Sequence, residues 1–192
     1  MSTAAEARAI LFGDMLACEE VRPAAFVAGA SDSAALYSFG TRGEALLRAL
    51  AVIEDGARSE AHASIEPEQP GDHAIHRIEA KLDLLTLLVA NVCAGDETDP
   101  LRSLQWSARG ACLAVDRPLP PGTSGHFRVR PADWLPSPLL LPATVIACDT
   151  DASGATRAWL RFDLLSPALE AALERHLFRI HRRSIAESRR PR

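Results

Sequence analysis

The chain has 192 residues, of which 47% are hydrophobic and 24% are charged, and its formal net charge is −4. These proportions are typical of a globular protein and exclude a globally disordered chain. No apolar run reaches the length of a membrane span and no signal-peptide pattern opens the sequence, so we expect a cytoplasmic protein. No C-x-x-C pair occurs, which excludes a disulfide framework or a cysteine zinc site as the organising feature. The cysteines are Cys18, Cys93, Cys112 and Cys148.

Charge is divided unevenly along the chain. Residues 1–100 hold 17 acidic and 7 basic residues, a net charge of −10, whereas residues 101–192 hold 8 acidic and 14 basic residues, a net charge of +6. Seven arginines fall within residues 175–192. This asymmetry indicates two kinds of surface. The arginine-rich end suits an acidic partner or nucleic acid, although the acidic chain as a whole disfavours nonspecific binding of DNA.

The first 35 residues leave their structure open between helix and strand. Thr3 and Glu6 have the spacing of a helical capping box, but residues 10–16 fit an extended segment equally well. A proline and a glycine bracket residues 24–27, which predicts a short strand there. Residues 29–35 are predicted as a loop.

The next segment, residues 41–57, has the apolar spacing of a helix. Thr41 and Glu44 repeat the capping-box pattern, and Gly56 is placed to end the helix as a C-cap. Residues 58–71 carry prolines and a glycine among charged residues, which predicts a linker or a long loop.

The strongest pattern in the sequence is a heptad repeat within residues 72–95. Asp72 can cap this helix at its start and Gly95 at its end, and no residue between them breaks a helix. Both core positions are apolar over nearly three heptads, which is the condition for knobs-into-holes packing between helices. The core residues are Ile75, Ile78, Leu82, Leu85, Val89 and Val92.

Two interpretations of this repeat are open. A single amphipathic helix normally packs on the core of its own chain, where such an apolar face is ordinary. Here Leu84, Leu87 and Leu88 widen the apolar surface beyond a two-stranded seam, and branched residues at the second core position favour more than two strands. We therefore expect residues 72–95 to join copies of the chain.

The apolar pattern changes to a period of two after residue 99, which is typical of strands in an antiparallel barrel or sandwich. The predicted strands are 101–107, 110–116, 126–130, 138–148 and 157–164. The residues expected on the buried face of the last strand are Ala158, Leu160, Phe162 and Leu164. Trp159, on the other face, is expected to pack beneath a helix, with the C-terminal helix as the candidate.

The chain ends in an amphipathic helix over residues 166–187, with Ser166 as its N-cap and Pro167 at its first position. Arginines flank its apolar side, and residues 188–192 are expected to fray. The apolar side consists of Leu169, Leu173, Leu177 and Ile180.

We find no enzyme in the residue pattern. The sequence has no nucleophile elbow, phosphate-binding P-loop or dinucleotide-binding turn. Glu79 and Asp83 have i, i+4 spacing, but they flank basic residues on a helix surface and are predicted to form solvated ion pairs. The histidines lack a carboxylate or thiol set at ligand spacing, so no metal site is expected.

One segment, QWSARG at residues 105–110, carries a candidate ligand site. A hydroxyl, a guanidinium and a glycine in a tight turn can present donors to a phosphate oxygen. By itself such a segment usually indicates only a turn. The candidate residues are Gln105, Ser107, Arg109 and Gly110.

Together with three other segments, this one resembles the atypical, tetramer-forming branch of the PilZ family, bacterial β-barrel receptors for cyclic di-GMP. The three segments are HRIEAKLDLLTLLV at 76–89, PPG at 120–122 and RHLFRIHRR at 175–183. The resemblance implies one α+β domain over 1–192, in which a PilZ-like antiparallel barrel is interrupted by two helices, the second a long heptad-repeat helix of a four-stranded coiled coil. It assigns 9–35 and 99–165 to barrel strands, 41–95 to the inserted helices and 166–187 to a C-terminal helix.

The chain departs from the family where the nucleotide binds. PilZ receptors that bind well have R-x-x-x-R ahead of the barrel, whose arginines stack on guanine and bridge phosphates, and (D/N)-x-S-x-x-G on the barrel. Here Gln105 stands in place of Asp or Asn, and the nearest approach to the first motif is Arg77 with Lys81 on the coiled-coil helix. Because lysine does not reproduce the planar, bidentate contacts of arginine, we expect weak or no direct binding of cyclic di-GMP. No other cofactor is expected.

The resemblance implies a non-catalytic signalling or adaptor protein in cyclic di-GMP-dependent regulation, such as that of motility, adhesion or virulence. We expect a homotetramer that acts with a protein partner which senses the nucleotide. One alternative is a direct cyclic di-GMP receptor that binds through the QxSxxG segment. Another is a structural oligomerisation scaffold whose barrel docks proteins. Nucleic-acid binding by the arginine-rich end is the least expected role.

Overall fold

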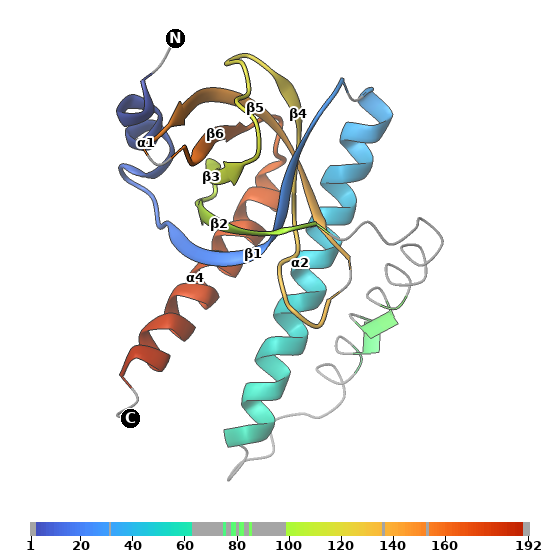
Figure 1. The fold of residues 1–192 in the computed structure, drawn as a ribbon. Helices are drawn as coiled ribbons and strands as arrows, with labels where there is room; N and C mark the ends of the chain where they lie inside the picture. Colours follow the sequence, from blue (N-terminus) through green and yellow to red (C-terminus); the bar gives the residue numbers. More distant parts are fainter. Residues whose placement is uncertain are drawn as a thin grey trace.

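Six antiparallel strands of the computed structural model close into a barrel, in the order β1-β2-β3-β6-β5-β4 (Figure 1). The strands are β1 (Cys18–Ala28), β2 (Leu101–Trp106), β3 (Gly110–Val115), β4 (Ser124–Val129), β5 (Leu139–Thr150) and β6 (Thr156–Phe162). The helices are α1 (Ala4–Phe12), α2 (Ser33–His62) and α4 (Pro167–Ser188). The structure describes residues 3–30, 32–62, 75, 78, 79, 81, 82, 85, 99–135, 137–152 and 154–189, with side chains for all of these except 55–62.

The first strand closes the barrel because it pairs with two partners in turn. Residues 18–23 of β1 pair with β2, and residues 24–28 pair with β4. The change of partner follows Pro23, which has no N–H to donate to a ladder. The predicted strand at 24–27 was therefore too short, because pairing with β2 extends it back to Cys18. The wider assignment of 9–35 to barrel strands was wrong at both ends, which belong to α1 and α2.

A helix, and not an extended segment, forms at the N-terminus. Thr3 and Glu6 make the predicted capping box: Thr3 Oγ1 accepts from the Glu6 backbone N–H (3.2 Å), and Glu6 Oε2 accepts from the Thr3 backbone N–H (2.9 Å). The buried face of α1 lies on the outside of the barrel, where Leu11 packs with Trp159. Trp159 thus packs beneath a helix as expected, but that helix is α1 and not the C-terminal one.

The second helix is longer than the predicted 41–57. It begins after Asp32, whose Oδ1 accepts from the Ala35 backbone N–H (2.7 Å). Thr41 is not an N-cap, because its hydroxyl donates to the Tyr37 carbonyl (3.1 Å) within the helix. Gly56, predicted as a C-cap, also lies inside α2. A glycine or hydroxyl residue within a helix lowers its stability by only about 1 kcal/mol. Tertiary packing of α2 outweighs that cost, so the helix continues through these positions.

The barrel interior forms one core with the buried faces of α2 and α4, which lie against each other (Figure 1). The helical members of this core include Leu46, Leu47 and Leu50 of α2 and Leu169, Leu173 and Leu177 of α4. Burial of these leucines stabilises α2 as tertiary packing does for most helices. The helix consequently takes in the end of the predicted loop at 29–35 and the start of the predicted linker at 58–71.

The C-terminal half follows the predicted order of strands and helix. Ser166 caps α4 as expected, since its Oγ accepts from the Leu169 backbone N–H (3.1 Å), and Pro167 is the first residue of the helix. The placement of Leu164 on the buried face was wrong. It is 83% exposed with φ 57°, because β6 ends at Phe162 and the chain turns.

Part of the heptad repeat lies within the described residues. Ile75, Ile78, Leu82 and Leu85 are all helical, and their exposed fractions lie between 53% and 57%. More than half of the surface of each of these residues is therefore open on the single chain. The predicted caps and the core residues Val89 and Val92 lie outside the described residues.

Candidate functional site

The turn between β2 and β3 holds the predicted ligand residues, beginning with Ser107. This side chain is fully buried. Its Oγ donates to the Leu11 carbonyl (2.7 Å) and accepts from the Arg109 backbone N–H (3.1 Å). The hydroxyl therefore joins α1 to the turn.

Gly110 serves the same contact between the turn and its neighbours. A Cβ at this position would lie 2.1 Å from the Leu160 carbonyl oxygen and 2.7 Å from Leu11 Cδ2. Such a close approach of backbone to backbone admits only glycine. The serine and glycine of the QxSxxG segment are thus packing residues in this chain.

Gln105 and Arg109 point to different surroundings. Gln105 pairs in register with Glu19 of β1 and Cys112 of β3, and it lines a cavity of about 500 Å³ on the outer face of the sheet. Arg109 is exposed at the turn and does not belong to that lining. Of the four predicted residues, Gln105 alone lines this cavity.

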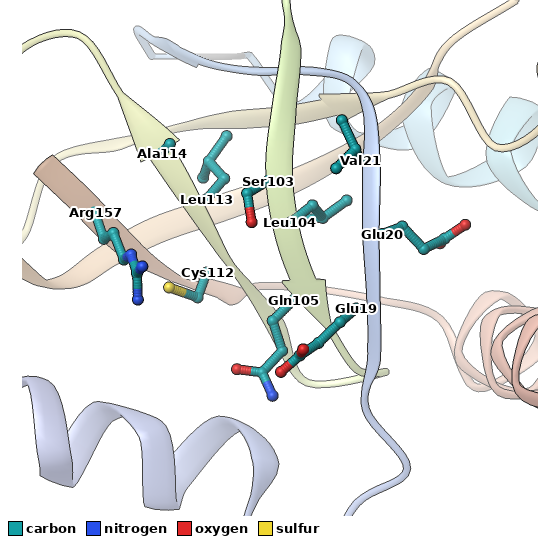
Figure 2. Close-up of a pocket in the computed structure, with 10 residues that line it drawn as sticks. All are labelled: Glu19, Glu20, Val21, Ser103, Leu104, Gln105, Cys112, Leu113, Ala114 and Arg157. Carbon is teal, nitrogen blue, oxygen red and sulfur yellow. The ribbon is translucent and has the colours of Figure 1, made fainter. Parts of the chain in front are cut away.

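The cavity is lined mainly by β1, β2 and β3 with one residue of β6 (Figure 2). Figure 2 shows the Glu19 and Gln105 side chains next to each other, with Cys112 and Arg157 on the other side of the cavity and Glu20 pointing away. The lining residues are Glu19, Glu20, Val21, Ser103, Leu104, Gln105, Cys112, Leu113, Ala114 and Arg157.

The charges on this face do not suit an anionic ligand. Arg157 is the only cation among the described lining residues, and it is opposed by the Glu19 carboxylate. The other carboxylate is already compensated, because Glu20 accepts from Arg22 Nε (2.8 Å) and from Trp106 Nε1 (3.0 Å). A phosphate placed here meets one guanidinium and one carboxylate of the lining, and Arg8 of α1 adds a second cation close enough to act on Cys112, so the net attraction is modest.

A nucleophilic role for the cavity cysteine is not supported. Burial raises the pKa of the Cys112 thiol to about 11, although Arg157 and Arg8 act in the opposite direction. The reactive form of cysteine is the thiolate, which is scarce at neutral pH when the pKa is so high. The thiol acts as a small apolar group in the contact with α1.

Three residues of the cavity, Glu19, Cys112 and Arg157, were not predicted from the sequence. Strand alternation places each of them on an outward face. They come together only through the register of the strands. Gln105 pairs with Glu19 on one side and with Cys112 on the other. Cys112 in turn pairs with Trp159 of β6, two residues along the strand from Arg157. No sequence signal states that register.

Neither a metal-holding cluster nor a membrane-spanning helix lies in the part of the chain that the structure describes. There, no group of three or more His, Cys, Asp and Glu side chains is placed to hold a metal ion. None of the described helices has the length and hydropathy of a membrane span.

Comparison with known proteins gives a family and a close structural match. A model of the family described as "Atypical PilZ domain, cyclic di-GMP receptor" matches residues 47–190. A pathogenic protein from Xanthomonas campestris, described as a new tetrameric PilZ domain self-assembled through an unusual helical bundle, shares 42% sequence identity. The alignment covers 95% of this chain and 97% of that one, with a TM-score of 0.75. No curated protein matches the chain.

Two more distant structures match about half of the chain. YcgR from Escherichia coli, solved in complex with cyclic di-GMP, has 21% identity over 49% of this chain and 41% of its own, with a TM-score of 0.40. The inhibitor of motility MotI/DgrA from Bacillus subtilis has 20% identity over 48% of this chain and 44% of its own, with a TM-score of 0.37.

Proposed function

This chain belongs to the atypical PilZ domain family, and we propose that it is a non-catalytic adaptor in cyclic di-GMP-dependent regulation that binds the nucleotide weakly or not at all. It acts in the cytoplasm as a homotetramer, together with a protein partner that senses cyclic di-GMP. Its biological setting is the one implied by the family resemblance: motility, adhesion or virulence.

The observation that carries this proposal is the internal use of the QxSxxG segment. The Ser107 hydroxyl is fully buried against Leu11, and Gly110 lies under the Leu160 carbonyl. The lining of the remaining face offers a dianionic nucleotide one guanidinium, that of Arg157, beside the Glu19 carboxylate. Each charge-assisted hydrogen bond that is missing removes about 1.5–3 kcal/mol, so a few missing bonds lower the affinity by orders of magnitude.

The tetramer is supported by the exposed heptad residues. Ile75, Ile78, Leu82 and Leu85 each expose more than half of their surface on the single chain. An apolar stripe of this kind is typical of an interaction surface. The tetrameric Xanthomonas campestris relative is described as self-assembled through a helical bundle, which agrees with an assembly of this kind.

Calorimetric titration with cyclic di-GMP tests the binding part of the proposal. We expect the wild-type chain to bind with a Kd no tighter than about 100 µM, which corresponds to about −5.5 kcal/mol. The double variant Glu19→Gln, Gln105→Asn removes the opposing carboxylate and restores the residue type of the family motif. We expect it to bind at least about tenfold more tightly than the wild type.

A matched control is Glu170→Gln, which removes one exposed carboxylate from α4, away from the cavity. Its affinity should equal that of the wild type. Micromolar binding by the wild type that is lost in Arg109→Ala, or in Ser107→Ala shown by circular dichroism to be folded, would contradict the proposal and establish a direct receptor.

A further inference from the structure

The outward face of α4 carries alternating basic and apolar side chains. Its opposite face is buried in the core, where Leu169, Leu173 and Leu177 are each 1% exposed or less. The outward residues are spaced three or four apart, so they lie in one row on one side of the helix. The row, which we name the α4 stripe, consists of Arg175, Phe178, Arg182, Ile185 and Arg189, all exposed.

A cavity of about 560 Å³ opens beside the α4 stripe, between α4 and the segment that follows α1. Its apolar part is formed by Met15, Leu16, Ala108, Leu177 and Phe178. Phe178 is 53% exposed, so the cavity has an aromatic wall open to solvent. The volume lies within the range of about 300–1,000 Å³ that is usual for binding cavities. It can admit a large apolar side chain from another molecule.

Three arginines, Arg175, Arg179 and Arg182, also line this cavity. The Arg182 guanidinium lies over the Phe178 ring, with 5.9 Å between its Cζ and the ring centroid. Arg179 also lines the cavity, but its Nε donates to Glu54 Oε2 (3.2 Å). Arg175 and Arg182 have no ion-pair partner among the described residues. An aromatic ring held by an arginine is a combination enriched at the centres of protein interfaces.

We propose that the α4 stripe and its cavity form the docking surface for an acidic amphipathic helix of a partner protein. An apolar residue of the partner enters the cavity against Phe178. The carboxylates of the partner helix, one per heptad, pair with Arg175, Arg182 and Arg189. These arginines are seven residues apart, which is about 10 Å along a helix. The α4 stripe would thus be the partner-binding surface of the adaptor proposed above, and only the biological setting of the docking rests on that proposed function.

The same residues disfavour a lipid or nucleic-acid ligand. A membrane-surface helix inserts a broad apolar face into lipid, but the broad apolar face of α4 is buried in its own core. Asp14 and Glu174 also line the cavity, where they repel a row of phosphates. A partner helix avoids this repulsion if its apolar residue lies between Asp14 and Glu174. Its carboxylates then lie beside the arginines, where they form ion pairs.

Fluorescence anisotropy with two designed peptides tests the inference without cyclic di-GMP. The probe is a synthetic amphipathic helix of about 18 residues with Glu and Leu at heptad spacing, and its comparison peptide has Lys in place of every Glu. We expect the acidic peptide to bind the full chain at least about tenfold more tightly than the Lys peptide at low salt, and to weaken as salt is added. Phe178→Ser and Arg182→Glu should each weaken it by about tenfold or more.

Tyr37→Ser and Arg117→Glu are the matched controls, since both residues are exposed and lie outside the α4 stripe and outside both cavities. They should leave the affinity unchanged, and circular dichroism should show all variants folded.

Equal binding of both peptides, unchanged affinity in both stripe variants, or no binding of the acidic peptide up to about 1 mM would overturn the inference. So would a change of solution mass in Phe178→Ser, which would make the stripe a contact between copies. Stripe-dependent binding of phosphatidylglycerol vesicles or duplex DNA, tighter than that of the peptide, would reassign the surface. Because no nucleotide is present, these outcomes are independent of the cyclic di-GMP titration.

Discussion

At the scale of single residues, Ser107 and Gly110 show that residues of a motif associated with ligand binding also serve packing. Both residues contact Leu11 of α1, through the Ser107 hydrogen bond and through the space left by the missing side chain of Gly110. The turn between β2 and β3 is thereby tied to the helix that covers the sheet. Replacing either residue should act first on stability.

Gly110→Ala is predicted to destabilise the protein by about 1–3 kcal/mol or more, because its Cβ would meet the Leu160 carbonyl at 2.1 Å. Urea unfolding followed by tryptophan fluorescence measures the change. Gly40→Ala is the matched control: it lies within α2 with nothing within 4 Å of its Cβ, so it should stabilise by about 0.5–1 kcal/mol. Equal effects of the two substitutions would contradict the close approach at Gly110.

His176 is the second residue with a measurable consequence. It is 1% exposed, its ring meets Trp106 edge-on at 5.8 Å, and neither ring nitrogen has a hydrogen-bond partner in the described structure. Burial, followed by the charges of Arg179, Arg22 and Arg183, lowers the pKa of His176 from 6.5 to about 3. The folded protein therefore holds this imidazole neutral throughout the mildly acidic range.

The lowered pKa predicts a loss of stability in acid. As the pH falls below about 6.5 the unfolded chain binds a proton at this position that the folded chain does not, until the pH approaches about 3. Between about pH 7 and pH 5 the predicted loss is about 2 kcal/mol. His176→Phe should remove that part of the pH dependence, as measured by urea unfolding at each pH. If the wild type and the variant lost stability in parallel, the histidine would not be the cause.

At the scale of elements, α1 is a separate small layer on the outside of the barrel. Its core of Ala7, Leu11, Cys112, Ala147 and Trp159 is distinct from the main core inside the barrel. Leu11 also connects this layer to the turn between β2 and β3, through the Ser107 hydrogen bond and the close approach of Gly110. The helix therefore docks through a small apolar cluster in which Leu11 is fully buried.

Leu11→Ala is predicted to destabilise the protein by about 2–5 kcal/mol, because this side chain is fully buried against Trp159. Ile10→Ala is the control on the same helix: Ile10 is 47% exposed, and its loss should change stability by no more than about 0.5 kcal/mol. Chemical denaturation of both variants gives the comparison. No loss of stability in Leu11→Ala would show that α1 unfolds independently of the barrel.

At the scale of the whole molecule, the described residues include two exposed apolar rows of different character. The heptad residues form an uncharged apolar row, which suits identical helices packed together. The α4 stripe alternates apolar residues with arginines, which suits an acidic partner. We propose that the first assembles the protein and the second recruits a partner.

Leu85→Asp is predicted to convert tetramers into monomers or aggregates, because four copies of a buried carboxylate cannot pack in one bundle. Light scattering with and without cyclic di-GMP measures the solution mass. Leu164→Asp, at a residue 83% exposed on the barrel, should remain tetrameric. A wild-type chain that is monomeric at micromolar concentration would contradict the assembly. If Leu85→Asp abolished the tetramer but left every response to cyclic di-GMP unchanged, the result would favour the alternative of a structural scaffold.

The sequence by itself determined the elements whose signals are local. The N-cap at Ser166 and the period-two strands after residue 99 depend on neighbours within a few positions, and both appear in the structure. The capping-box spacing at Thr3 is equally local, but it left the N-terminal segment open between helix and strand until the structure showed α1. The motifs and their order were also enough to indicate the PilZ family, which the family match confirms.

Only the tertiary structure decided the elements and contacts that depend on distant partners. α2 extends through its glycines because its leucines enter a common core, and β1 continues past Pro23 because a second strand takes over the pairing. The roles of Ser107 and Gly110 changed for the same reason, since the contact with α1 joins residues almost a hundred positions apart. Burial and register are properties of the assembled barrel, and local sequence patterns do not contain them.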